Sequence, residues 1–186
     1  MGRPKQLLPM GGQPMVRRVA EMTCSAGLDQ VVVVVGAHAE AIGETLADLP
    51  LEIITNQAWA EGMSTSLRAG LTALRPDIQA ALIILADQPT LTSQLLRDLV
   101  ARYAATGAPV VVPYFEGQRG NPVLFDRALF PRLMAVEGDR GGRAVLQDYD
   151  GWLEQVDVTS AAILEDVDTQ EDYAKFSGRL SHDPPH

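Results

Sequence analysis

Two acidic regions of this 186-residue chain have the surroundings expected of ligands for a hard cation. Asp87 directly follows the apolar run 82–86, so its carboxylate is expected at the end of a buried strand, where ligand clefts form. Asp166 and Asp168 belong to the acidic stretch 166–172, and either could be a second ligand opposite Asp87. Mg²⁺ prefers few protein carboxylates supplemented by phosphates and waters, so a polyphosphate would complete the site. A turn carboxylate and a helix start would explain the same residues without a metal.

Segment 61–66, Glu-Gly-Met-Ser-Thr-Ser, could bind the phosphates or the base of a nucleotide. It precedes a predicted helix, and the free N–H groups at a helix N-terminus attract anions. Gly62, Ser64 and Ser66 are therefore candidate nucleotide-binding residues. The same segment would also serve as an ordinary helix cap, with Ser64 as the capping residue, so both interpretations stay open.

Several cationic side chains could hold phosphate groups. Arg3 and Lys5 lie near the start of the chain, Arg119 lies in the loop Gly-Gln-Arg-Gly-Asn-Pro, and Arg140 and Arg143 lie in the loop Gly-Asp-Arg-Gly-Gly-Arg. The amide of Asn121, in the same loop as Arg119, is a further candidate. An ammonium group can neutralise charge on a phosphoryl group, and paired guanidiniums can clamp a phosphate. A tight turn would explain each of the two glycine-containing loops by itself.

The elements that must position these side chains alternate along the chain. Continuous apolar runs at 31–35 and 80–86 predict strands buried in a parallel sheet, and a further strand is expected at 51–55. Shorter strands are expected at 110–112, 122–125 and 156–158, and helices at 14–27, 39–49, 64–74, 92–106, 127–135, 143–148 and after 169. This alternation predicts a Rossmann-like three-layer α/β sandwich with a mainly parallel sheet, in which ligands bind at the carboxyl ends of the strands.

Length and composition restrict the class of protein. We expect one domain over residues 1–176 and a flexible tail over 177–186. The formal net charge is −9 and no cluster of basic residues occurs, which argues against nucleic acid as a partner. No apolar run approaches the roughly 20 residues of a membrane span. With Cys24 as the only cysteine and no signal-peptide core, the protein is expected to be cytoplasmic and not to associate with membranes.

The order of these motifs along the chain carries a resemblance to a known family. Residues 1–8, Met-Gly-Arg-Pro-Lys-Gln-Leu-Leu, are similar to the second half of the nucleotidyltransferase signature L-A-A-G-x-S-x-R-M-G-x-P-K. The matching pieces that follow are Glu-Gly-Met-Ser-Thr-Ser-Leu at 61–67, Ala-Asp-Gln-Pro at 86–89, Gly-Asn-Pro-Val-Leu-Phe at 120–125, Gly-Asp-Arg-Gly-Gly-Arg at 138–143 and Asp-Val-Asp-Thr at 166–169. From Met1 to about Lys175 the chain resembles the molybdenum cofactor cytidylyltransferases, which are MobA/MocA-like nucleotidyltransferases.

The resemblance implies transfer of CMP from CTP to the phosphate of the molybdopterin cofactor, with release of pyrophosphate and with Mg²⁺ as cofactor. A xanthine dehydrogenase-like enzyme would accept the product. It implies that Lys5 and Asp87 are catalytic: Lys5 would stabilise the triphosphate and its transition state, and Asp87 would bind magnesium together with Asp168. The residues implied to bind the nucleotide are Arg3, Lys5, Gly62, Ser64, Ser66 and Asp87. The residues implied to contact the second substrate are Arg119, Asn121, Arg140 and Arg143.

The sequence departs from the family pattern in two respects. Ala86 stands where the family usually has Gly. The strand and phosphate loop that precede R-M-G in the family have no counterpart here, so the fold is expected to lack its first strand and this form of the chain could be inactive. We hypothesise that a methionine inside the signature was taken as the start codon. An in-frame upstream sequence similar to L-A-A-G-x-S-x-R would support this, and an immediate upstream stop codon would contradict it.

Other functions remain open at this point. The chain could transfer a nucleotide to another phosphate, with GTP as donor to the same pterin or with a sugar 1-phosphate as acceptor. It could also be an inactive relative that binds and carries the molybdenum cofactor. A dinucleotide-dependent dehydrogenase is disfavoured, because no G-x-G-x-x-G follows a predicted strand.

Overall fold

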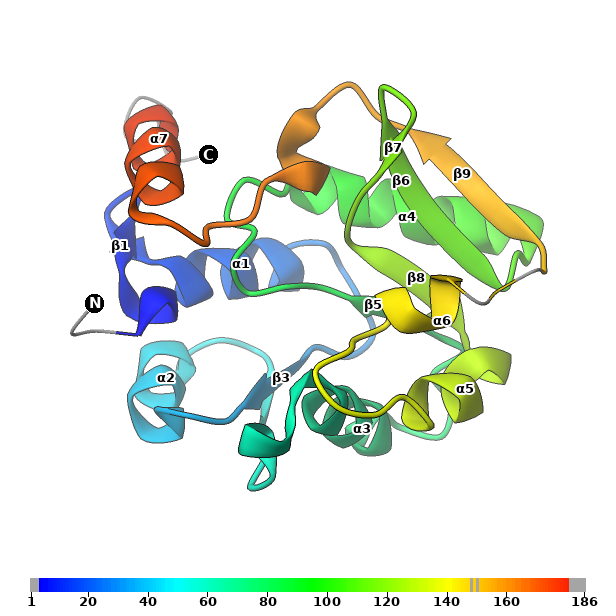
Figure 1. Cartoon of the computed structure of the whole chain (residues 1–186), viewed down its shortest axis with the longest axis horizontal. Coiled ribbons are helices and arrows are strands. Elements are labelled where there is room, and N and C mark those ends of the chain that lie inside the picture. Colours follow the sequence, from blue (N-terminus) through cyan, green and yellow to red (C-terminus); the bar gives the residue numbers. More distant parts are fainter. Residues whose placement is uncertain (1–3, 148, 150, 181–186) are drawn as a thin grey trace.

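The protein is an α/β structure with a five-stranded sheet, a separate two-stranded parallel sheet and helices on both sides (Figure 1). The computed structural model describes residues 4–147, 149 and 151–180. The strands are β1 (Pro9–Met10), β2 (Gln13–Pro14), β3 (Val32–Val35), β4 (Glu52–Thr55), β5 (Ala80–Ile83), β6 (Val110–Phe115), β7 (Gln118–Arg119), β8 (Val123–Asp126) and β9 (Leu153–Asp157). The helices are α1 (Met15–Cys24), α2 (Ala39–Leu46), α3 (Met63–Ala73), α4 (Ser93–Thr106), α5 (Phe130–Met134), α6 (Arg143–Gln147) and α7 (Gln170–Leu180), with 3₁₀ turns η1 (Lys5–Leu7), η2 (Trp59–Glu61), η3 (Arg127–Leu129) and η4 (Ala161–Leu164).

The predicted α/β class is confirmed, but the larger sheet is mixed rather than mainly parallel. Its order is β5-β8-β6-β7, with β9 also paired to β6. Strand β8 runs antiparallel to both of its neighbours, and only β9 is parallel to β6. The reason is the short connection 116–122 between β6 and β8. A parallel crossover needs a dozen or more residues, so a connection of this length returns the chain in the opposite direction.

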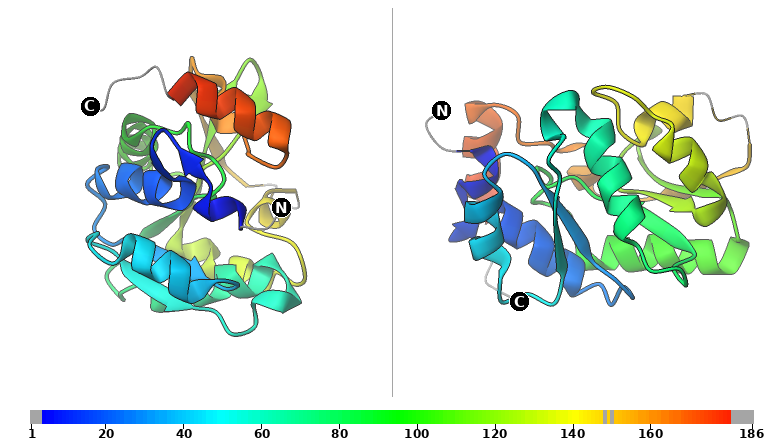
Figure 2. Two further views of the ribbon diagram at one scale, coloured as in Figure 1. Left: turned by 90° about the vertical axis from the view of Figure 1, so that its left-hand side faces the viewer. Right: turned by 90° about the horizontal axis from the view of Figure 1, so that it is seen from below.

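Side-chain alternation on β6 produces the three layers. Val110 and Val112 are fully buried on one face, where they pack with residues of α3, α5 and α6. Val111 is fully buried on the other face, against α4 and η4. Figure 2, in the view from below, shows α4 on one side of the sheet and α3, α5 and α6 on the other. This period of two along a strand is what a sheet covered on both faces requires.

Strands β3 and β4 form their own parallel sheet, in which Val35 is opposite Thr55. The helices α1 and α2 cover it through an apolar cluster that includes Val16, Ile42 and Leu46. The run of valines was predicted to be buried on both faces, yet in β3 only Val35 is buried and the others are partly exposed. In the described part of the chain β3 and β5 belong to different sheets, so the hydrogen-bonded ladder is interrupted between them.

The N-terminal segment and α7 lie side by side, although they are at opposite ends of the sequence (Figures 1 and 2). Met10, Met15, Val167 and Phe176 form one buried cluster between them. The hydroxyl of Tyr173 donates a hydrogen bond of 2.5 Å to the Pro9 carbonyl. This contact brings η1 against the segment that leads into α7. Helix α7 ends at Leu180, so it includes residues 177–180, which were expected to belong to a flexible tail. Among the described residues no helix is long and apolar enough to cross a membrane.

A hydrogen bond between Tyr103 and Asp126 ties α4 to the end of β8 and gives a pH-dependent prediction. The Tyr103 hydroxyl lies 2.5 Å from Asp126 Oδ2. Burial, followed by the nearby carboxylate, raises the pKa of Tyr103 from 10.0 to about 12. Because the folded pKa is the higher one, this stabilisation is complete below pH 10 and is lost as the pH rises towards 12.

We therefore expect one of the four tyrosines to ionise near pH 12 in an ultraviolet titration of the folded chain. That late step should be missing from Tyr103→Phe, and the variant should lose less stability than the wild type between pH 10 and 12. An unchanged titration curve in the variant would contradict the assignment.

Candidate active site

The centre of the candidate site is an ammonium group between two carboxylates. Lys5 Nζ lies 2.9 Å from Asp87 Oδ2 and 2.8 Å from Asp168 Oδ1. The Lys5 and Asp87 side chains are 32% and 23% exposed, whereas Asp168 is 68% exposed, so the cluster opens to solvent on the Asp168 side. Three residues predicted separately from the sequence therefore meet at one point. Arg3, the other early cation, lies outside the described residues.

Backbone contacts hold the two carboxylates together. Asp87 follows β5 in the chain, and its carbonyl accepts a hydrogen bond of 2.9 Å from the Val167 amide. The side chain of Asp172 accepts hydrogen bonds from the Asp168 amide and from both the amide and the hydroxyl of Thr169. These bonds from Thr169 lower the pKa of Asp172. The acidic stretch thus both starts a helix and contributes to the site.

Asp166 is a third carboxylate beside the cluster. It is partly buried, and its Oδ1 atom is shielded from solvent without a hydrogen-bond partner among the described residues. Loss of solvation is the largest effect that raises the pKa of Asp166, and repulsion from Asp87 raises it further. The hydrogen bond from Gln88 and the positive charge of Arg143 lower this pKa, but by less. The sequence offered Asp166 only as an alternative to Asp168. Its proximity to Asp87 and Arg143 depends on tertiary contacts.

These residues fit a divalent cation. Asp87 Oδ1 is also shielded and without a protein partner in the described part of the chain, so a carboxylate oxygen is left for another ligand. No group of three or more His, Cys, Asp or Glu side chains arranged around one metal position occurs among the described residues. Such a sparse set suits Mg²⁺, which keeps most of its ligands as water and phosphate.

Lys5 carries a full positive charge in this arrangement. Partial burial by itself would lower its pKa, but hydrogen bonds to Asp168 and Asp87 and the attraction of both charges outweigh that effect and raise it. An ammonium at this place can neutralise negative charge on a phosphate chain.

The start of α3 is occupied by the loop around Gly138. The Ser64 amide donates to the Gly138 carbonyl at 3.1 Å, and the Met63 amide donates to Asp139 Oδ1 at 3.3 Å. The capping residue is Gly62, so the prediction that Ser64 caps this helix is wrong. Ser64 is 1% exposed, with a hydroxyl that has no partner among the described residues. The loop contributes a carbonyl and a carboxylate here, which satisfy N–H groups that the sequence left free.

Asn56 is a residue of this region that the sequence analysis did not select. It directly follows β4 and is buried. Its amide donates to the Thr65 hydroxyl at 2.7 Å and to the Ser66 hydroxyl at 3.0 Å, and its Oδ1 accepts from the Ala58 amide. Asn56 therefore fixes the turn before α3, including the predicted nucleotide-binding Ser66. A polar residue immediately after a strand was the available signal, as it was for Asp87.

The residues predicted to contact a second substrate have mostly free side chains. Arg119 and Asn121 are partly buried, Arg140 and Arg143 are exposed, and for the three guanidiniums the described residues offer no hydrogen bond or ion pair. The backbone around Asn121 is fixed, because its amide donates to the Ile163 carbonyl at 3.0 Å. Free guanidiniums on fixed loops are available for an anionic ligand.

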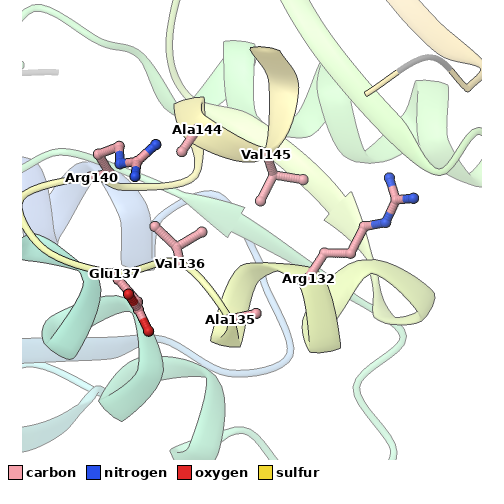
Figure 3. Close-up of a pocket in the computed structure, with 7 residues that line it drawn as sticks. All are labelled: Arg132, Ala135, Val136, Glu137, Arg140, Ala144 and Val145. Atoms are coloured by element: carbon pink, nitrogen blue, oxygen red, sulfur yellow. The ribbon is translucent and has the colours of Figure 1, made fainter. Parts of the chain in front are cut away.

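Arg140 also borders an open hollow of about 410 Å³ between α5 and α6 (Figure 3). Figure 3 shows the lining side chains Val136 and Val145 between Arg140 on one side and Arg132 on the other. The Arg132 guanidinium lies 5.9 Å from the centre of the Tyr149 ring. Arg143, by contrast, is near Asp166, so the structure directs the two predicted arginines of one loop to different surroundings.

The fold and the cluster of Lys5, Asp87 and Asp168 define an α/β protein with a site suited to a metal and a phosphate chain. The chain belongs to the MobA-like NTP transferase domain family, a family of nucleotidyltransferases, because the model of that family matches residues 1–156. The family resemblance drawn from the sequence is confirmed at this level. The match extends over most of the chain and includes Lys5 and Asp87.

Two curated proteins are similar to this chain in sequence. The chain is 32% identical over 183 residues to nicotine blue oxidoreductase from Paenarthrobacter nicotinovorans, a match that covers 92% of this chain and 87% of that protein. It is 31% identical over 108 residues to the bifunctional protein GlmU of Exiguobacterium sibiricum, covering 58% of this chain but only 24% of GlmU.

Solved structures share the fold. The homologue of Mycobacterium tuberculosis Rv0371c from Mycobacterium sp. strain JC1 has a TM-score of 0.86 at 27% identity, covering 97% of this chain and 89% of that one. The Rv0371c complex with manganese has a TM-score of 0.83 at 24% identity, covering 95% and 93% of the two chains.

Proposed function

We propose that this protein transfers CMP from CTP to the terminal phosphate of the molybdopterin cofactor, with release of pyrophosphate. The observation that carries the proposal is the meeting of Lys5, Asp87 and Asp168, with contacts of 2.8 and 2.9 Å. Asp87 lies in the turn that follows β5, which ends at Ile83. Family membership supports nucleotidyl transfer, while the sequence resemblance supports CTP and molybdopterin in particular. The manganese complex of an Rv0371c protein supports a divalent cation, for which we propose Mg²⁺.

Residues of this chain would act by positioning and charge neutralisation. Asp87 and Asp168 would hold the magnesium ion, which when bound supplies further charge neutralisation to the phosphates. Lys5 would bind the triphosphate and stabilise the charge that develops on the leaving pyrophosphate. An oxygen of the acceptor phosphate forms a bond to the α-phosphorus of CTP, and the bond between that phosphorus and the bridging oxygen to the β-phosphate breaks.

The acceptor would be held by three guanidinium groups and one amide on the loops 117–122 and 138–143. Arg119 and Asn121 would bind one part of the second substrate, and Arg140 and Arg143 another. Arg143 is near enough to Asp166 to affect its pKa, which links this group of residues to the metal carboxylates. A xanthine dehydrogenase-like enzyme would then receive the dinucleotide form of the cofactor.

The test is pyrophosphate release with Mg²⁺, measured for CTP and GTP, with molybdopterin cofactor or a sugar 1-phosphate as acceptor. The proposal expects turnover with CTP and molybdopterin. Turnover with GTP or with the sugar phosphate instead would retain nucleotidyl transfer but replace the substrate. Binding of molybdopterin without pyrophosphate from any nucleotide would favour an inactive carrier.

The similarity to nicotine blue oxidoreductase favours a second candidate, the oxidation or reduction of nicotine blue or a related compound. In its support, that match covers most of both chains. Against it, no G-x-G-x-x-G follows a strand. Incubation with nicotine blue and a reduced nicotinamide cofactor tests this candidate. If the colour of nicotine blue is lost only when the protein is present, this candidate replaces the first proposal.

Trp59 allows a test of the proposal that the nucleotide binds near residues 62–66. Trp59 is 50% exposed and precedes Gly62 by three residues. It lies against Gly36, the residue that follows β3, because a Cβ added to Gly36 would lie 2.5 Å from the Trp59 Cβ. An exposed indole can stack on a base. We expect CTP with Mg²⁺ to quench the fluorescence of Trp152→Phe, in which Trp59 is the only tryptophan. Trp59→Phe is the matched control and should not respond; quenching of Trp152 alone would contradict this position.

A further inference from the structure

The ammonium of Lys5 lies where a divalent cation would need to bind. Its Nζ contacts one oxygen of each proposed metal ligand, at 2.9 Å for Asp87 and 2.8 Å for Asp168. Those two contacts are the side-chain hydrogen bonds that Asp87 and Asp168 make within the described part of the chain. The carboxylates, which repel each other, are thus held together by a cation that belongs to the protein.

A magnesium ion that bridged Asp87 Oδ2 and Asp168 Oδ1 could not occupy the same space as this ammonium. Mg²⁺ requires ligand oxygens at about 2.1 Å with nearly octahedral geometry, whereas the ammonium occupies the space between the carboxylates at hydrogen-bond distance. Two cations at one position would also repel each other strongly in a partly buried site. Lys5 therefore has to leave the carboxylates when a metal arrives, and the nearest strong acceptors would be the phosphates of the nucleotide.

We infer that Lys5 is a built-in placeholder for the divalent cation: it keeps Asp87 and Asp168 in place without metal and moves to the triphosphate when metal and nucleotide bind together. The inference rests on the proposed function, which supplies the metal and the triphosphate. Through Lys5, the binding of the metal and the binding of the nucleotide are coupled. Metal alone must compete with Lys5, while metal with nucleotide offers Lys5 a new partner.

Removing the charge of Lys5 should therefore have opposite effects on two affinities. Lys5→Met should bind Mn²⁺ alone about tenfold more tightly than the wild type, because no ammonium competes for the carboxylates. The same variant should bind Mn²⁺ together with CTP less tightly, because the triphosphate loses its ammonium partner. A purely structural role for Lys5 would weaken both.

Mn²⁺ binding can be measured by electron paramagnetic resonance on the folded wild type, Lys5→Met, Lys5→Arg and Lys175→Met. Lys175, the only other lysine, lies on α7 and contacts the Phe176 ring, so it is a matched control that should behave as the wild type. Lys5→Arg keeps the charge and should keep weak binding of Mn²⁺ alone. Unchanged or weaker binding of Mn²⁺ alone by Lys5→Met, or no binding by either protein, would overturn the inference.

A second measurement follows Lys5 in the wild-type protein, and a variant is used only to assign its signal. Reductive ¹³C-methylation of the wild type labels Lys5, Lys175 and the terminal amine, and the Lys5 signal can be assigned by its absence from Lys5→Met. Mg²⁺ without nucleotide should shift the Lys5 signal and leave the Lys175 signal in place. If the Lys5 signal does not move at saturating Mg²⁺, the placeholder role is overturned.

These experiments separate the inference from the proposed function. If the protein releases no pyrophosphate but the metal displaces Lys5 as described, the proposed function is wrong and the placeholder role of Lys5 stands. A chain that turns over CTP while Lys5→Met leaves the affinity for Mn²⁺ alone unchanged would keep the function and lose the placeholder.

Discussion

We expect Asp87→Asn to lower the rate of pyrophosphate release by about 10²–10³-fold, the usual effect of removing one well-placed electrostatic group from an active site. The substitution keeps the size of the side chain but removes the negative charge that pairs with Lys5 at 2.9 Å and would hold the metal. The fold should persist, because this ion pair is partly exposed and such pairs contribute little to stability. Steady-state rates with CTP and circular dichroism of the same preparations test both statements.

Asp77→Asn is the matched control for this prediction. Asp77 also pairs with a cation, Arg75, at 3.2 Å, but its side chain is 70% exposed and the pair does not include any proposed site residue. We expect the control to leave turnover unchanged. Equal losses in the two variants would show that the effect of Asp87→Asn is not local, and full activity of Asp87→Asn would exclude Asp87 as a metal ligand.

The second large effect is expected at Gly62, where the chain turns into α3. Gly62 has φ +114, a conformation that L-residues rarely adopt, and a Cβ there would lie 2.5 Å from the carbonyl carbon and oxygen of Gly138. Because both contacts are with backbone, the loop that binds the Ser64 amide would have to move. Gly62→Ala should therefore lower the free energy of unfolding by roughly 1–3 kcal/mol from backbone strain, with the displaced contact adding to it.

Gly43→Ala provides the opposite case. Gly43 lies inside α2, and a Cβ there meets no atom within 4 Å. Alanine is the better helix former, so this variant should gain up to about 1 kcal/mol. Urea unfolding of both variants and the wild type measures the difference. A Gly62→Ala protein as stable as the wild type would mean that the Gly138 loop is not fixed by this contact.

Local sequence determined the elements and much of the site. The apolar runs were sufficient to predict β3, β4 and β5, since a continuous β-branched or apolar run favours a strand over a surface helix. A helix was predicted over 92–106, and Thr92 is the residue that caps α4, because its hydroxyl accepts a hydrogen bond from the Leu95 amide. Asp87 could be selected because it follows a predicted strand, and ligands bind beyond the carboxyl ends of strands in this class of fold.

Pairings between distant segments could not be predicted in the same way. The direction of β8 depends on the length of one connection, and the hydrophobic pattern of a strand does not encode its direction. The partner of the Ser64 amide is the Gly138 carbonyl, which comes from a loop far along the chain. Local capping rules treat the start of α3 as free, and tertiary contacts override them.

The sequence by itself determined an α/β chain with an acidic residue after a strand, a second acidic stretch and a lysine near the start. Only the tertiary structure decided that Lys5 contacts carboxylates 82 and 163 positions away, and that Asp166 is desolvated beside them. The physical reason is that charge and polarity are properties of single residues, whereas distance and desolvation arise when packing of the N-terminal segment against α7 closes the chain around the end of β5.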